Sequence, residues 1–96
     1  MRLRFTPQAL VELENILGYL VLASTQGAAR VQKRIQTITD LLPDRPFAGQ
    51  RVGPSGLRRV VANPYPYLVF YQVTDDEIII VGVRHSARDP SSMPGR

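Results

Sequence analysis

The sequence has no cysteine and only one histidine, His85, among its 96 residues. Without cysteine, neither a disulfide framework nor a thiolate zinc site can form. A single histidine argues against a histidine-based catalytic metal cage, so we expect no metal and no cofactor. No apolar run approaches the roughly 20 residues of a membrane span, and residues 1–5 contain no apolar signal core. We therefore expect a cytoplasmic protein without a membrane partner.

Lysine is almost absent as well: eleven of the twelve basic residues are arginine, and the net charge is +4. Arginine binds carboxylates and phosphates through a planar fork that lysine lacks. The charge therefore fits a phosphate backbone, an acidic protein or a merely solvated basic surface, and charge alone does not choose among them. With 44% hydrophobic and 21% charged residues, the chain has the composition of one globular domain.

Three apolar runs in the second half of the chain, residues 57–62, 67–73 and 78–83, are rich in Val, Ile, Tyr and Phe. Such side chains suit a pleated, half-buried surface. The proline-containing segment 63–66 and the polar segment 74–77 separate the runs. Because connections this short make neighbouring strands antiparallel, the pattern predicts a three-strand meander.

The first half of the chain predicts a strand and a helix. Residues 2–5 alternate polar and apolar side chains, as a strand does. Thr6 suits an N-cap, and Pro7 suits the first helical position, where its missing N–H costs nothing. Leucines then recur at helical spacing, which predicts a helix over about residues 7–22.

A second helix should follow almost at once. Ser24 or Thr25 can cap it, its apolar residues repeat on one face, and Pro43 ends it near Leu42. So short a link makes an antiparallel helical hairpin, and residues 43–55 then read as a loop. The order predicts an α+β fold, β-α-α-β-β-β, with a mainly antiparallel four-stranded sheet and the α-helical hairpin packed on one face.

The predicted strands are apolar on both faces, although one hairpin covers only one face. Alternation places Leu68 and Phe70 opposite Tyr67, Val69 and Tyr71. On the last strand the same alternation sets Ile78 and Ile80 against Ile79, Val81 and Val83. An apolar sheet face without cover from its own chain marks a partner site.

Basic residues offer the main candidate chemistry. Arg84, His85 and Arg88 lie at the end of the last strand and could grip phosphate or carboxylate, with His85 as a proton carrier. We favour the alternative for His85, a histidine hydrogen-bonded at a strand end, since a lone histidine seldom acts without an orienting partner. Arg58 and Arg59 should face opposite sides of the sheet. The one on the open face could receive an acidic partner segment or be a solvated edge charge.

In its order of motifs the chain resembles the RelE/ParE superfamily of bacterial toxins from type II toxin–antitoxin pairs, and most closely its ParE-like members. The resemblance runs through Phe-Thr-Pro-Gln-Ala at 5–9, Gly-Leu-Arg-Arg at 56–59, Pro-Tyr-Leu-Val-Phe-Tyr-Gln-Val at 66–73 and Val-Arg-His-Ser-Ala-Arg-Asp-Pro at 83–90. It implies a single toxin domain over residues 1–90. Residues 91–96 show no periodicity, so we expect them to form a flexible tail.

The superfamily implies two activities. RelE-like members are ribosome-dependent endoribonucleases that cut messenger RNA, and they resemble one another in a basic set that this sequence mostly lacks. No lysine follows Lys33, Leu68 stands where a strand arginine is expected, and no tyrosine follows Tyr71. If the chain were a nuclease, Arg88 and His85 would carry the chemistry. The resemblance to ParE-like members implies instead that this toxin binds and poisons DNA gyrase, without catalysis by the toxin.

The resemblance also implies a cognate antitoxin, ParD-like or a similar small protein. Its N-terminal part would dimerise and bind operator DNA, so the toxin meets that DNA only indirectly, and its C-terminal part would wrap the toxin. We expect the antitoxin to contact Leu13, Leu17, Ile35, Arg58, Arg59, Leu68, Phe70 and Tyr71. We expect the gyrase contact at Arg84, His85 and Arg88. A third hypothesis is a non-toxic binding module or co-repressor.

Overall fold

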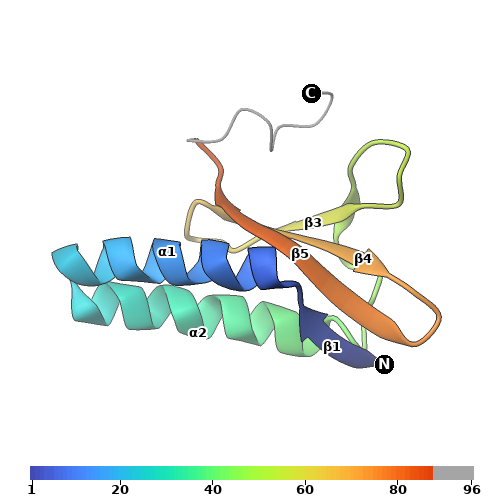
Figure 1. Cartoon of the computed structure of the whole chain (residues 1–96), viewed down its shortest axis with the longest axis horizontal. Coiled ribbons are helices and arrows are strands. Elements are labelled where there is room, and N and C mark those ends of the chain that lie inside the picture. The colour runs from blue at the N-terminus through green and yellow to red at the C-terminus, as the bar shows by residue number, and fades with distance from the viewer. Residues whose placement is uncertain (88–96) are drawn as a thin grey trace.

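The computed structural model describes residues 1–87, and it shows two helices beside a five-stranded sheet (Figure 1). The strands are β1 (Arg2–Phe5), β2 (Gln50–Arg51), β3 (Arg58–Val61), β4 (Tyr67–Val73) and β5 (Glu77–His85). They lie in the order β1-β5-β4-β3-β2, with β1 parallel to β5 and every other pair antiparallel. The α+β prediction is confirmed, including the meander. The predicted tail at 91–96 lies outside the described residues.

The prediction of four strands is wrong by one strand, because β2 lies in the segment that reads as a loop. Its two residues, Gln50 and Arg51, pair with Arg59 and Arg58 of β3. A strand of two residues is too short to show any alternation in the sequence.

The helices α1 (Pro7–Ala23) and α2 (Thr25–Leu41) form the predicted antiparallel hairpin. Thr6 caps α1 with its side-chain oxygen, as the sequence indicates. Ser24 alone links the helices: it ends α1, and its Oγ accepts a 2.9 Å hydrogen bond from the Gly27 N–H at the start of α2. In the described part of the chain, neither helix has the length and apolar character needed to cross a membrane.

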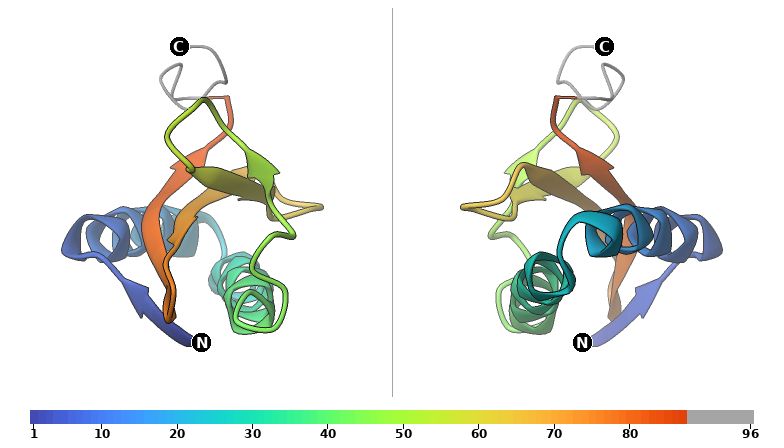
Figure 2. Two further views of the ribbon diagram at one scale, coloured as in Figure 1. Left: turned by 90° about the vertical axis from the view of Figure 1, so that its right-hand side faces the viewer. Right: turned by 90° about the vertical axis from the view of Figure 1, so that its left-hand side faces the viewer.

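The hairpin covers one face of the sheet, and Figure 2 shows its two helices side by side, with α2 seen nearly along its axis. The core between hairpin and sheet is built from apolar side chains of both layers. Its buried members are Ala9, Val31, Ile35, Ile38, Leu42, Ala62, Tyr67, Val69, Tyr71, Ile78, Ile80 and Val83. Tyr67, Val69 and Tyr71 therefore face the helices, as alternation along β4 predicts.

On β5 the predicted alternation is wrong at Val83, which lies in the helix-side core together with Ile80. The cause is a shift in the register between β4 and β5. Tyr71 pairs with Ile80, whereas the residue before Tyr71 pairs with Gly82, so Val81 is an extra residue on β5. One extra residue reverses the direction of every later side chain on the strand.

Candidate functional site

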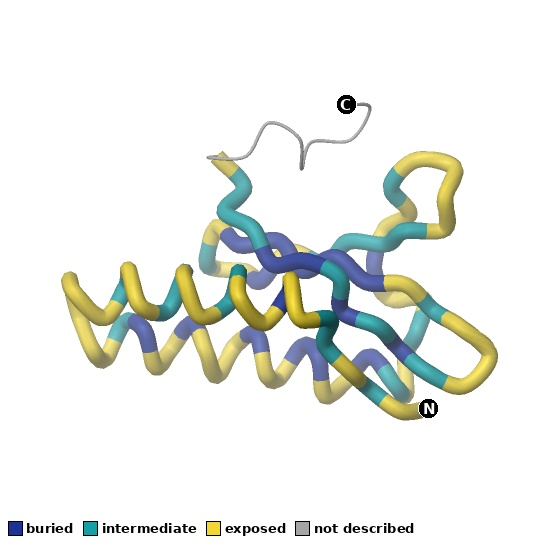
Figure 3. The backbone as a smooth tube through the Cα atoms, viewed as in Figure 1, coloured by how far each residue is buried: buried dark blue, intermediate teal, exposed yellow. Residues whose placement is uncertain are grey.

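The sheet face opposite the helices is not an open apolar surface at its centre. Leu68 and Phe70 project from β4 on that face, yet they are only 4% and 6% exposed. In Figure 3, buried residues lie along the middle of the sheet. The guanidinium carbon of Arg84 lies 5.9 Å from the centroid of the Phe70 ring. The expectation of an uncovered apolar face is therefore wrong at Leu68 and Phe70, and for Phe70 an arginine of the next strand supplies part of the cover.

Arg84 is also tied to the helical hairpin. Its Nε lies 3.5 Å from Oε2 of Glu12 in α1. The other oxygen of Glu12, Oε1, accepts a 2.9 Å hydrogen bond from the Val83 N–H. This carboxylate thus satisfies a backbone donor of β5 and pairs with a neighbouring cation. Arg84, predicted to contact the target, belongs to a bridge between α1 and β5.

His85 sits at the end of β5, with its ring edge-on to Tyr67 at a centroid distance of 5.3 Å. Its Nδ1 accepts a 3.0 Å hydrogen bond from the Ala87 N–H. This geometry agrees with the interpretation of a histidine hydrogen-bonded at a strand end. Of the three residues predicted to contact the target, Arg84 and His85 pair with Leu68 and Tyr67, so their side chains point to opposite faces of the sheet. Arg88 lies outside the described residues.

Arg58 and Arg59 face opposite sides of the sheet, as predicted, because Arg58 pairs with Tyr71 and Arg59 with Phe70. Arg58 donates a 2.8 Å hydrogen bond to the Gly49 carbonyl and helps hold the loop before β2. Arg59 lies on the face away from the helices, where Nη2 donates to the side-chain oxygen of Gln50 at 3.2 Å. Its Nε is buried and has no hydrogen-bond partner in the described part of the chain.

Four of the residues predicted to contact the antitoxin are not surface residues: the two β4 residues already described as buried on the face away from the helices, and two residues of the core. Tyr71 is 0% exposed and Ile35 is 2% exposed, because the sheet and hairpin enclose them. The Tyr71 hydroxyl has a structural role, since it accepts from the Gly49 N–H and donates to the Pro46 carbonyl, both at 2.8 Å. The predicted contacts Leu13 and Leu17 are partly buried against the core.

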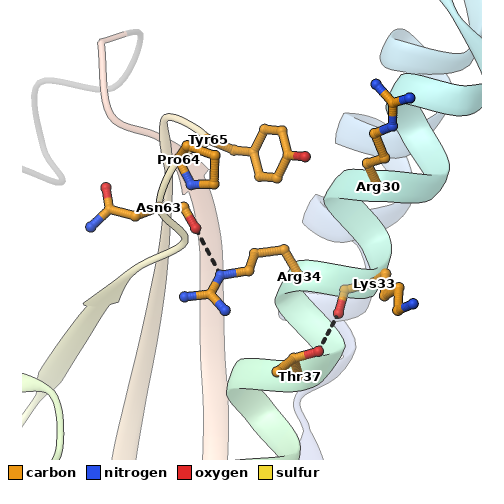
Figure 4. A pocket seen from close by; sticks show the side chains of 7 residues that line it. All are labelled: Arg30, Lys33, Arg34, Thr37, Asn63, Pro64 and Tyr65. Atoms are coloured by element: carbon orange, nitrogen blue, oxygen red, sulfur yellow. Dashed lines mark hydrogen bonds between the residues drawn. The ribbon is translucent and has the colours of Figure 1, made fainter.

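The sequence analysis did not single out a groove between α2 and the β3–β4 loop, which has a volume of about 360 Å³ (Figure 4). It is lined by Arg30, Lys33, Arg34, Thr37, Asn63, Pro64 and Tyr65. Arg34 fixes one wall to the other, because its Nε donates a 2.7 Å hydrogen bond to the Asn63 carbonyl. The sequence does show the cations of one wall, which lie close together on one predicted helix. It does not show the opposing wall, because Asn63 lies 29 positions after Arg34 in the chain.

Neither the sheet face nor the groove has the ligands of a metal site. Over the described residues, no group of three or more His, Asp or Glu side chains is placed to hold a metal ion. The chemistry that both surfaces offer is cationic: guanidinium groups, one ammonium and one imidazole beside aromatic rings. Such surfaces bind carboxylates or phosphates.

Comparisons with known proteins place the chain in a family. A family model described as the ParE toxin of the type II toxin-antitoxin system, parDE, matches residues 3–90. Toxin RelE2 of Caulobacter vibrioides is 37% identical over 84 residues, which cover 88% of this chain and 93% of that protein.

Two solved structures share the fold. The chromosomal ParDE system from P. aeruginosa matches with a TM-score of 0.75 and 24% identity, over 88% of this chain and 95% of that chain. The intact RelBE toxin-antitoxin complex of E. coli matches with a TM-score of 0.61 and 18% identity, over 91% of this chain and 98% of that chain. Because both sequence identities are below 25%, these two structures show only that the fold is shared. Since the family model spans nearly the whole chain and the Caulobacter toxin is similar throughout, the protein belongs to the ParE toxins of type II toxin-antitoxin systems.

Proposed function

We propose that this toxin is ParE-like in action: it inhibits DNA gyrase by binding it, and a cognate antitoxin neutralises it by direct contact. The observation that carries the proposal is the match of residues 3–90 to the ParE toxin family. The resemblance to ParE-like toxins implies that the target is gyrase and that the toxin itself catalyses no reaction. The proposed target contact is the end of β5, at Arg84 and His85, together with Arg88.

The geometry at the end of β5 supports a binding role over catalysis. Cleavage of RNA by its own 2′-hydroxyl needs a base, an acid and stabilisation of the charged phosphorane. His85 already accepts a hydrogen bond at Nδ1, and Arg84 is paired with Glu12. Both groups are engaged with their own chain, and the carboxylate that pairs with Arg84 also accepts a hydrogen bond from the Val83 N–H.

A gyrase assay tests the proposal. Purified toxin is added to gyrase and relaxed plasmid, and supercoiling is followed together with linear DNA released after protein denaturation. We expect inhibited supercoiling and trapped cleavage complexes, with both effects removed when the antitoxin is added first. A toxin that arrests growth yet leaves gyrase unaffected in this assay would contradict the proposal.

The second candidate is a RelE-like ribosome-dependent endoribonuclease, which is favoured by the resemblance to Toxin RelE2 of Caulobacter. It requires translated messages to be cut in the presence of ribosomes. Arg88→Ala and His85→Ala should then abolish the cuts, because these residues would supply the acid, base and charge stabilisation. Overexpression without antitoxin that leaves growth unchanged would point instead to a non-toxic binding module or co-repressor.

We place the antitoxin on the accessible members of the predicted contact set. Arg59 is the best candidate, because it is partly exposed on the sheet face away from the helices, where its guanidinium group could bind a carboxylate of the antitoxin. Arg58, Leu13 and Leu17 would lie at the margin of the contact. We expect the free toxin to melt at a lower temperature than the complex, since a ligand that binds only the folded state stabilises it. Equal melting temperatures would count against this placement.

A further inference from the structure

The groove between α2 and the β3–β4 loop concentrates positive charge on one short stretch of helix. Arg30 and Lys33 are three positions apart, and Arg30 and Arg34 are four apart, so all three side chains lie on neighbouring turns of one face. Arg30 and Lys33 are exposed. No ion pair among the described residues involves any of the three.

No acidic side chain of α2 lies within one helical turn of these three cations. Like charges three or four positions apart destabilise a helix, whereas a carboxylate at the same spacing would stabilise it. The positions one turn away carry Gln26 and Thr37, and the one acidic residue of α2, Asp40, lies six positions beyond the last cation. A partner that brings carboxylates into the groove would relieve this repulsion.

The floor and far wall of the groove are largely apolar. Figure 4 shows Tyr65 projecting from the β3–β4 loop into the space in front of α2, with Pro64 beside it. Tyr65 is partly buried and packs against the core, so its ring is a fixed surface. The Arg34 hydrogen bond to the Asn63 carbonyl holds loop and helix together at 2.7 Å. The groove therefore offers an apolar seat with cations along one rim.

This combination favours an acidic peptide over a nucleic acid. Grooves for single-stranded nucleic acid stack successive bases on several aromatic rings and track the backbone with cations. Here one ring is present and the cations end within about two turns, or roughly 10 Å of helix. Carboxylates one turn apart on a partner helix are separated by about 5.4 Å along its axis, which matches the spacing of the cations.

We propose that this groove binds an acidic amphipathic segment of a protein partner, with carboxylates on Arg30 and Lys33 and an apolar side chain seated on Tyr65 and Pro64. The proposal goes beyond gyrase inhibition and does not depend on it. It rests on the proposed function only in expecting a protein partner, for which the antitoxin is the first candidate.

The test measures fluorescence anisotropy of a labelled helical peptide of about 18 residues, or five turns, titrated with the full-length chain. The peptide carries glutamates four positions apart with leucines between them, and a second peptide has glutamine at each glutamate. The wild-type chain should bind the glutamate peptide and not the glutamine peptide. The double variant R30E/K33E should weaken binding about tenfold, because it replaces two attractions with two repulsions.

The matched control is R45E/R51E, which changes the net charge equally at two exposed arginines outside the groove. Its loss of affinity should stay below about threefold, the effect of long-range charge alone. Equal losses in the two variants would overturn the proposal, because binding would then follow net charge rather than the groove. So would a labelled oligonucleotide of about 12 nucleotides that binds through Arg30 and Lys33 while the peptide does not. Melting temperatures of both variants that do not fall below the wild-type value confirm that folding is intact.

A negative result in the gyrase assay does not change how this experiment is interpreted, because the peptide titration contains no gyrase. Conversely, a groove that ignores the acidic peptide leaves the gyrase proposal standing. A co-purified antitoxin extends the test: wild-type chain and R45E/R51E should retain it at high dilution, and R30E/K33E should release it. Retention by all three would show that the antitoxin contact does not use the groove.

Discussion

The two helices of the hairpin have the same length, 17 residues, but opposite relations to the core. α1 is rich in leucine and valine, yet Ala9 is its one fully buried residue. α2 is mostly polar, yet it buries five residues: Ala28, Val31, Ile35, Ile38 and Thr39. The large apolar side chains that remain exposed are concentrated on α1, at Leu10, Val11, Tyr19, Val21 and Leu22.

The difference teaches that burial follows from where a helix lies and how its residues are spaced, and not from how apolar it is. In α2 the apolar residues fall on one narrow stripe that meets the sheet, and the rest of the surface is free to carry charge. α1 lies against β5 and α2, and it is fastened by the Glu12 carboxylate as well as by Leu13, Ile16 and Leu17. The apolar side chains of α2 thus hold it against the sheet, whereas α1 is held by a carboxylate as well as by apolar side chains.

Ile35→Ala should give the largest effect, since it removes three methyl or methylene carbons from a residue that is 2% exposed in the centre of the α2 stripe. We expect a loss of about 2–5 kcal/mol in the free energy of unfolding, from lost burial and the cavity left behind. Urea unfolding followed by circular dichroism measures it. A loss below about 0.5 kcal/mol, within the range of surface changes, would mean that α2 is not the main apolar anchor.

Glu12→Ala tests the polar anchor of α1. It should cost about 1–3 kcal/mol, because the Val83 N–H loses its acceptor in a partly buried place. Glu12→Gln should recover much of that loss, since an amide oxygen can still accept from the Val83 N–H while the pairing with Arg84 is gone. Glu14→Ala, on the exposed side of α1, is the control. Equal losses in the two Glu12 variants would show that charge, and not the hydrogen bond, fastens α1.

Ser24→Ala tests the single residue that joins the helices. The expected loss is about 1 kcal/mol, because the Gly27 N–H loses the side-chain oxygen that caps α2. Thr25→Ala removes a neighbouring hydroxyl that does not cap, and it should leave stability unchanged or slightly higher. Amide hydrogen exchange adds a local readout: the first turn of α2 should exchange faster in Ser24→Ala, while α1 should be unaffected.

Local signals in the sequence were sufficient for most of the fold. Thr6 and Ser24 mark the helix starts because a capping hydroxyl acts on a backbone N–H three positions away, and prolines mark the loop between β3 and β4. The β4 alternation also needs only its own residues. The sequence therefore predicted the order of the helices and the meander, and its resemblance led to the correct family.

What the sequence did not predict depends on contacts between distant segments. The register shift that turns Val83 into the core is a property of the β4–β5 pair, and β2 exists only because β3 offers it an edge. The cover of Phe70 by Arg84 required the bulge and the bridge to Glu12 together. For the same reason the groove was not predicted, because its walls come from α2 and the β3–β4 loop.

Leu22→Ala should have the smallest effect and is the matched partner of Ile35→Ala, since each trims a large aliphatic side chain on a helix of the same hairpin. Leu22 is 87% exposed, so the free energy of unfolding should change by less than about 0.5 kcal/mol. The same urea titration measures it, run at two protein concentrations tenfold apart. A loss comparable to that of Ile35→Ala would contradict the comparison between the helices. If that loss also grew with protein concentration, the apolar side chains of α1 would be buried between copies of the chain, because only association makes stability depend on concentration.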